Sequence, residues 1–397
     1  MTNQKDLYFD NIFKITTMAL HISGSHPSIP KDLKWALKFT VLHGTFTLGF
    51  LMFMYNIVYH DFKENDFINI CKNGVMGIVT IVITFQYCIL LIHQDTLVVL
   101  IKNINADYEQ LQNLPDKEKQ FMYKYANLGA KVCWQWFVLT ISAVLTFLVK
   151  STGLMLYYCL INDFRYVPFY DIKYPEFIEE RKNDNLPVYL SVYFLMFFFA
   201  CYACMNYVAY VPLGPIFMLH ASGQLELIKN QIDDLFSECD PEKIRMKLRD
   251  IIMKLQYIYS IVDDMKGVFK IGYEIALKGT ALLLPVTIYA VLEAAKKGEV
   301  SMEFICFIIG GIMLCTSPCY YSDLLMEKGE AVRLSLYMCG WEQHYDRRTR
   351  TTLQLMLLRA LRPIAIQTLF RTLCLDALTD LFQQSYGIFN LMNAMWN

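Results

Sequence analysis

The chain has 397 residues, of which 55% are hydrophobic, 15% are aromatic and only 18% are charged. Water-soluble globular chains usually carry about 25% charged residues, so this composition predicts a protein that is dissolved in lipid. A net charge of -1 and 12 cysteines scattered among apolar runs exclude a disordered chain, a disulfide scaffold and a nucleic-acid-binding protein.

Seven stretches approach the roughly 20 apolar residues that a membrane-spanning helix requires. The last of them is the most polar, because Arg371, Asp376 and Asp380 interrupt it. The sequence therefore predicts an all-α membrane protein with a single seven-helix transmembrane domain over residues 1–397. The predicted spans are Trp35–Tyr59, Gly74–Ile92, Val132–Leu160, Val188–Phe217, Val268–Leu292, Met302–Tyr321 and Leu369–Met395.

The distribution of Lys and Arg predicts how these spans are oriented. The N-terminal segment and the second, fourth and sixth connecting segments together hold 23 of these residues, whereas the alternate set holds 8. Because positive residues favour the cytoplasmic side, we expect a cytoplasmic N-terminus and an extracellular C-terminus. This inverted topology argues against a G-protein-coupled receptor, whose N-terminus is extracellular.

Two connecting segments on the predicted cytoplasmic side have helical patterns. In Gln224–Lys266, apolar residues at spacings of three and four lie on both sides of an interruption at Asp240-Pro241, and in Met326–Thr352 charges alternate with apolar residues. We interpret residues 218–267 and 322–366 as cytoplasmic helical extensions of the spans. Their apolar stripes favour a packed anchor over a solvated loop.

Two features of the predicted outer half have more than one interpretation. The acidic and aromatic segment Asn162–Asn185 is either a lid over a binding site or a cap on the ends of two helices. Lys150 lies deep in the third span, where it extends to the interface, pairs with an outer-loop carboxylate or contacts a polar ligand group. We favour the first two interpretations for Lys150.

Enzyme signatures are missing from the chain. It contains no Gly-rich phosphate loop, no His-Glu-x-x-His and no Gly-x-Ser-x-Gly. Cys201 and Cys204 have the spacing of a metal or redox pair, but they lie within a span, where packing explains them better. We therefore expect no catalytic residues, no metal and no cofactor.

The polar residues of the last span recur at helical spacing. An acidic side chain at the membrane centre costs about 2.5 to 3.5 kcal/mol, so this stripe must face protein or water. Either it bonds to neighbouring helices, with Arg371 neutralising Asp376 or Asp380, or copies of this helix surround an aqueous pore. Spacing alone leaves both interpretations open. The stripe comprises Thr372, Asp376, Thr379, Asp380, Gln383, Gly387 and Asn390.

The C-terminal third contains motifs by which the chain resembles the insect odorant receptors. These are Glu330-Ala331-Val332, Leu336-Tyr337 followed by Trp341, Arg362-Pro363, and Ser385-Tyr386-Gly387-Ile388-Phe389. The resemblance implies a ligand-gated, non-selective cation channel in the plasma membrane of olfactory sensory neurons. It further implies a heterotetramer with the odorant receptor co-receptor. The fourth loop is shorter than the co-receptor's, which favours a ligand-tuning subunit.

The resemblance also implies where ligand and ions pass. A small volatile apolar ligand would bind in the outer half, among the second, third, fourth and sixth spans, and residues 367–397 would form the pore-lining last helix. The expected ligand-binding residues are Met76, Thr80, Phe147, Ser151, Leu154, Tyr193, Phe197, Phe304 and Ile308. The expected pore and gate residues are Asp376, Asp380, Gln383, Gly387, Ile388, Phe389 and Met392.

One alternative has the same inverted topology. A gustatory receptor-like channel would assemble without a separate co-receptor. It would carry a terminal Thr-Tyr-x-x-x-x-x-Gln-Phe pattern, which this chain lacks at its C-terminus. We therefore prefer the odorant receptor interpretation.

Overall fold

The computed structural model describes residues 8–111, 115–162, 164–182, 185–237, 240–298, 301–344 and 346–396, and this part of the chain is almost entirely α-helical. Six helical runs in it are long and apolar enough to cross a membrane, which confirms the predicted all-α membrane class. The seventh predicted span corresponds to a more polar helix of 22 residues, which is not among the six. The six are Leu33–Asp61, Phe67–Ile92, Glu118–Leu160, Leu186–Ser237, Pro241–Lys296 and Met302–Gln343.

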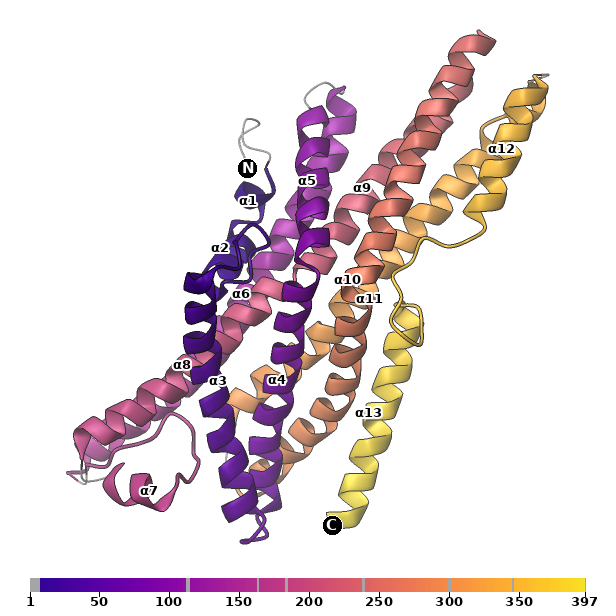
Figure 1. The fold of residues 1–397 in the computed structure, drawn as a ribbon. Helices are drawn as coiled ribbons and strands as arrows, with labels where there is room; N and C mark the ends of the chain where they lie inside the picture. Colours follow the sequence, from indigo (N-terminus) through magenta and orange to yellow (C-terminus); the bar gives the residue numbers. More distant parts are fainter. Residues whose placement is uncertain are drawn as a thin grey trace.

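The helices form an elongated bundle, in which α10 and α11 run along much of its length (Figure 1). We refer to its two ends as the α7 end and the α12 end, after the helices that lie there. The first eight helices are α1 (Phe9–Ile12), α2 (Lys14–Ser23), α3 (Leu33–Asn56), α4 (Phe67–Ile92), α5 (Gln94–Leu111), α6 (Asp116–Leu160), α7 (Glu176–Lys182) and α8 (Leu186–Tyr210). The others are α9 (Leu213–Asp233), α10 (Pro241–Lys296), α11 (Met302–Met338), α12 (Arg347–Ala360) and α13 (Leu375–Trp396).

Several helices begin at an aspartate whose side chain accepts a backbone hydrogen bond from the first turn. The Asp32 carboxylate accepts from the Trp35 N–H at 2.8 Å, and the Asp240 carboxylate accepts from the Glu242 N–H at 3.0 Å. Such caps satisfy N–H groups that the helix itself leaves unpaired. The interruption predicted at Asp240-Pro241 is confirmed, because it separates α9 from α10.

Three helices are much longer than a bilayer requires. α6, α10 and α11 contain 45, 56 and 37 residues, and at about 1.5 Å per residue α10 extends roughly 84 Å. A hydrocarbon core is about 30 Å thick, so these helices continue well beyond it. α5 and the first part of α6 lie in the second connecting segment between predicted spans, and α5 buries Leu97, Leu100 and Ile104 at helical spacing.

The last predicted span was wrong at its N-terminal end, since α13 begins at Leu375 and not at Leu369. The residues before it form a turn docked on α11. The Ile366 N–H donates to Ser322 Oγ at 3.2 Å, and the Leu373 N–H donates to the Ile366 carbonyl at 2.9 Å. These hydrogen bonds occupy backbone groups that a helix would use along its own axis.

The fourth predicted span, Val188–Phe217, is divided between two helices. α8 ends at Tyr210 and α9 begins at Leu213, with Pro212 between them. Proline lacks the N–H that would continue the hydrogen-bond pattern of α8. Phe217 therefore belongs to α9, which continues toward the α12 end.

Two glycines leave room for tyrosine side chains between α10 and its neighbours α8 and α9. A Cβ atom at Gly272 on α10 would lie 1.9 Å from the Tyr210 hydroxyl, and one at Gly214 on α9 would lie 1.6 Å from the Tyr273 hydroxyl. Both tyrosines are buried, so their rings have little room to move. The helices can pack at this distance only because these two positions lack a side chain.

We expect Gly272→Ala to destabilise the bundle by about 1 to 3 kcal/mol, the usual cost of overpacking a core. Lower surface expression and a lower thermal unfolding temperature in detergent would reveal the loss. Gly267→Ala on the same helix is the matched control, because nothing lies within 4 Å of its added Cβ. Equal behaviour of the two variants would contradict the packing argument.

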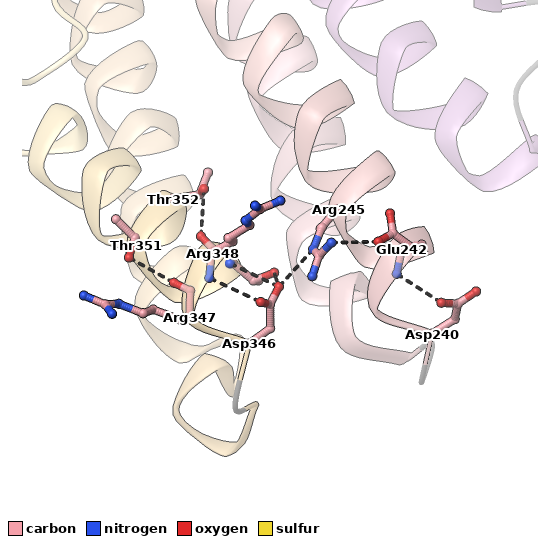
Figure 2. Close-up of polar contacts among 9 residues, drawn as sticks. Asp240, Glu242, Arg245, Asp346, Arg347, Arg348, Thr351 and Thr352 are labelled. Carbon is pink, nitrogen blue, oxygen red and sulfur yellow. Dashed lines mark hydrogen bonds and ion pairs between the residues drawn. The ribbon is translucent and has the colours of Figure 1, made fainter.

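Asp346 joins α12 to α10 near the α12 end, as Figure 2 shows. Its Oδ2 atom accepts from Thr349 Oγ1 at 2.7 Å and from Arg245 Nε at 3.0 Å, and Arg245 also contacts Glu242 at 2.7 Å. The Thr349 hydroxyl, followed by the Arg245 guanidinium, holds the pKa of Asp346 well below its ordinary value. The contact therefore exists as an ion pair throughout the neutral range.

We expect Asp346→Ala to loosen the start of α12, since both the cap and the contact with Arg245 are lost. Hydrogen exchange of the α12 amides should accelerate several-fold, while exchange in α4 should not change. Asp346→Asn should retain most of the cap and lose only the ion pair. Because the folded pKa is lowered, wild-type protection should be complete above the ordinary carboxyl range and should decrease as the pH falls below it. Wild-type protection that stays constant in acid would contradict this assignment.

Candidate functional site

An apolar cavity of about 90 Å³ lies among α4, α6, α8, α10 and α11. It is well above the roughly 10 to 15 Å³ that a single water requires. We call it the inner chamber, and its aromatic and aliphatic lining with few polar groups suits a small uncharged ligand. The lining residues are Met76, Val79, Trp136, Leu139, Thr140, Ala143, Val144, Phe147, Tyr170, Phe199, Ala200, Ala203, Cys204, Tyr207, Thr280, Leu283, Cys306, Phe307, Gly310, Gly311 and Leu314.

Small residues on two facing helices leave room for the chamber. α8 contributes Ala200 and Ala203, and α11 contributes Gly310 and Gly311. A Cβ added at Gly310 would meet only Leu139, at 3.9 Å. A larger side chain at Gly310 would therefore enter the chamber without an initial clash.

The segment between α6 and α7 folds inward and closes one side of the chamber. Phe169 and Tyr170 are 4% and 6% exposed, and the Tyr170 ring lies 4.5 Å from the ring of Phe147. Burial raises the pKa of Tyr170 well above its usual value, so its phenol stays neutral. The segment thus supplies a wall of the chamber in addition to covering helix ends.

Polar contacts fix this segment in place. The Lys173 N–H donates to Asn56 Oδ1 at 2.9 Å, and the Lys173 ammonium pairs with Glu64. The hydrogen bond from Lys173 to Glu64 raises the pKa of Lys173, which keeps the ammonium charged. The Val167 carbonyl accepts from the Tyr189 hydroxyl at 2.9 Å.

A second, more polar cavity of about 260 Å³ adjoins the inner chamber toward the α7 end. We call it the vestibule. Met76, Phe147 and Tyr170 line both cavities and form the partition between them. The charged residues of the vestibule are Lys72, Lys150, Arg165, Asp171 and Glu303.

Lys150 forms an ion pair at the edge of the vestibule. Its Nζ lies 2.5 Å from Glu303 Oε1, with Glu303 4% exposed and Lys150 50% exposed. Glu303 is in the first turn of α11, where the helix dipole stabilises a negative charge. Of the interpretations given for Lys150, pairing is therefore correct, and its partner belongs to α11.

The structure brings five of the nine predicted ligand-binding residues to these two cavities. Met76 and Phe147 line both, and Ser151, Leu154 and Phe304 line the vestibule. The other four, Thr80, Tyr193, Phe197 and Ile308, line neither cavity. Thr80 donates to the Met76 carbonyl at 2.8 Å, and the Tyr193 hydroxyl lies 2.9 Å from Ser151 Oγ, so both support residues that do line a cavity.

Sequence reasoning missed the contributions of α10 and of the inward-folded segment. Thr280 and Leu283 on α10 face the inner chamber, and Tyr170 closes it. The resemblance placed the pocket among four other spans, and α10 buries residues on several faces. The aromatic content of Asn162–Asn185 was the available signal for Tyr170.

The polar stripe of α13 lies on the outside of the single chain. Asp376, Asp380, Gln383 and Gly387 are exposed, whereas Leu381 and Ser385 are buried. The Ser385 hydroxyl lies within 3.4 Å of the Ala281 carbonyl of α10. The buried face of α13 thus packs on α10 and leaves the polar face outward.

The other predicted pore and gate residues lie farther along α13. Phe389 and Met392 pack against the cluster of Cys71, Tyr289 and Ala290, and Ile388 is half-buried. At the start of the helix, Arg371 Nη1 lies 3.3 Å from Asp380 Oδ2. Of the two acidic partners considered for Arg371, Asp380 is the one with which it pairs.

Comparisons with known proteins show which proteins this chain is similar to. The family model of the 7tm odorant receptors matches residues 66–386. Odorant receptor 10a of Drosophila melanogaster is 20% identical over an alignment that covers 45% of this chain and 46% of that receptor, so the chain matches about half the length of this relative. The olfactory receptor OR5 of the insect Machilis hrabei has a similar fold, with a TM-score of 0.67 at 13% identity and 96% of each chain covered. Its complex with eugenol gives a TM-score of 0.73 at 13% identity, with 97% of this chain and 98% of that chain covered.

Proposed function

Because this chain belongs to the 7tm odorant receptor family, we propose that it is a ligand-tuning odorant receptor subunit that binds a small uncharged volatile molecule in the inner chamber. Family membership makes it a multi-pass membrane receptor and not an enzyme. The observation that carries the proposal is the apolar chamber between α4, α6, α8, α10 and α11. The similar olfactory receptor of Machilis hrabei forms a complex with eugenol, which supports ligand binding by a fold of this kind.

The subunit is further proposed to form a non-selective cation channel with the odorant receptor co-receptor, as a heterotetramer in the plasma membrane of olfactory sensory neurons. The outward polar face of α13 supports this assembly. Asp376, Gln383 and Gly387 are exposed on the single chain, and an acidic side chain facing lipid is costly. If copies of α13 surrounded an aqueous path, its water would hydrate these groups. In this proposed assembly the N-terminus lies in the cytoplasm.

α10 supplies the proposed coupling between ligand and pore. Thr280 and Leu283 face the inner chamber, while the carbonyl of the intervening Ala281 lies next to Ser385 on α13. A ligand that fits the chamber better when α10 and α13 are displaced would increase the population of the open state. This mechanism requires neither a covalent step nor a proton transfer.

The direct test is whole-cell current in cells that express the chain with and without the co-receptor, across a panel of volatile odorants. We expect odorant-evoked cation current only with the co-receptor. Gly310→Leu should raise the half-maximal concentration of bulky odorants by about tenfold, consistent with an overpacking cost of 1 to 3 kcal/mol. Gly44→Leu is the control, because nothing lies within 4 Å of its Cβ and it lines neither cavity. Good surface expression without odorant current would refute the proposal.

A second test concerns ion permeation. Asp380→Asn should reduce the permeability of divalent relative to monovalent cations, because it removes a negative charge and leaves Arg371 in place. Reversal potentials in bi-ionic solutions measure this ratio. Glu330→Gln on α11 is the control, since it changes an exposed carboxylate that pairs with Arg333 of the same helix and does not belong to α13. Unchanged selectivity in Asp380→Asn would assign this residue to contacts between helices.

A further inference from the structure

A groove on the outside of the bundle lies next to the vestibule. It runs between α6 and the start of α11, and its rim includes Leu145, Val149 and Met302, which are 48%, 65% and 55% exposed. In a multi-pass membrane protein, such exposed apolar side chains face hydrocarbon. The mouth of the groove is therefore suited to contact with the interior of the bilayer.

Shared walls connect this groove with the inner chamber. Lys150, Leu154 and Glu303 line both the groove and the vestibule, just as Met76, Phe147 and Tyr170 separate the vestibule from the chamber. Two sets of shared side chains thus separate the groove from the inner chamber. The Lys150–Glu303 ion pair belongs to the first of them.

We propose that this groove is a lateral portal through which an uncharged odorant passes from the bilayer into the vestibule, and that the Lys150–Glu303 ion pair is its latch. The inference rests on the proposed function, because it assigns an access route to the proposed ligand chamber. The portal affects the rates at which ligand enters and leaves the chamber, and the chamber alone does not determine these rates.

The chemistry of the latch suits this role. The carboxylate of Glu303 is fixed by burial at the start of α11, whereas Lys150 is half exposed on a flexible four-carbon stem. Because Glu303 is buried and Lys150 borders a groove that faces lipid, separating the two charges leaves them with little water and is costly. The pair therefore holds this side of the vestibule closed, and the flexible Lys150 side chain is the part that moves when it opens. An apolar odorant that has partitioned into lipid then reaches the vestibule without returning to water.

Another wall of the vestibule is held by hydrogen bonds of the backbone. The segment that carries Phe169 and Tyr170 is fixed by Lys173 on Asn56 and Glu64, and by Tyr189 on the Val167 carbonyl. Opening on that side would break backbone hydrogen bonds. Opening at the groove requires only the movement of side chains.

Filling the groove tests the portal. Gly153 lines the groove but not the vestibule, and nothing lies within 4 Å of a Cβ built there. We expect Gly153→Phe to slow current onset and washout by the same factor under rapid odorant perfusion, with an unchanged half-maximal concentration. Gly44→Phe on α3, at another open position, should keep wild-type kinetics. Val149→Trp, also in the groove, is the second variant if Gly153→Phe does not reach the surface.

Removing the latch should have the opposite effect. The double variant Lys150→Met with Glu303→Gln leaves no unpaired buried charge. It should accelerate both onset and washout by the same factor, at least several-fold, because a pair with a buried partner is costly to separate in the wild type. Equal changes in both rates leave the equilibrium affinity unchanged, which distinguishes a barrier from a binding contact.

The outcomes separate the portal from the function on which it rests. Wild-type odorant current with unchanged onset and washout in both the groove-filling and latch variants would overturn the portal alone. A shifted half-maximal concentration with unchanged onset would also overturn it, because it would make these residues part of the binding site. Absence of odorant current in wild type and in Gly44→Phe, despite surface expression, would overturn the proposed function and the portal together.

Discussion

The packing of α10 against α8 and α9 through two glycine–tyrosine contacts is the constraint on which the rest of the bundle depends. It exists because Gly272 and Gly214 leave space for the hydroxyls of Tyr210 and Tyr273. α10 also contacts α4, α11 and α13, so one helix of 56 residues aligns most of the others. If α10 shifted where it packs on α8 and α9, the walls of the inner chamber and the packing of α13 would change together.

In the proposed mechanism, this shared helix lets a small ligand influence a distant element. Thr280 and Leu283 contact the chamber on one face of α10, and Ala281 contacts α13 on another. Successive residues on a helix point in different directions, but they move together when the helix moves. Packed interfaces change between discrete arrangements and do not deform continuously, so a small displacement of α10 is enough to change how α13 packs.

Helices were predictable from the sequence because bilayer thickness imposes a minimum length on every apolar run. The inner chamber was less predictable, because a cavity depends on which face of each helix turns inward. Thr280 on α10 illustrates the difficulty, since that helix buries residues on several sides. Tyr170 lies in a segment whose inward fold follows from hydrogen bonds to distant residues such as Asn56. The start of α13 depends likewise on a tertiary contact, between Ile366 and Ser322 of α11, and no local sequence pattern indicates this contact.

The two parts of the proposed mechanism differ in what a single chain provides. The inner chamber is lined by residues of five helices and by Tyr170 of the same chain. The face of α13 that carries Asp376 and Gln383 is not complete, because these polar groups point away from the chain and lipid would not solvate them. Ligand selectivity is thus expected to follow the individual subunit, while conduction follows the assembly. A subunit transferred between assemblies should keep its odorant preference, because the residues that line the chamber are carried by the subunit itself.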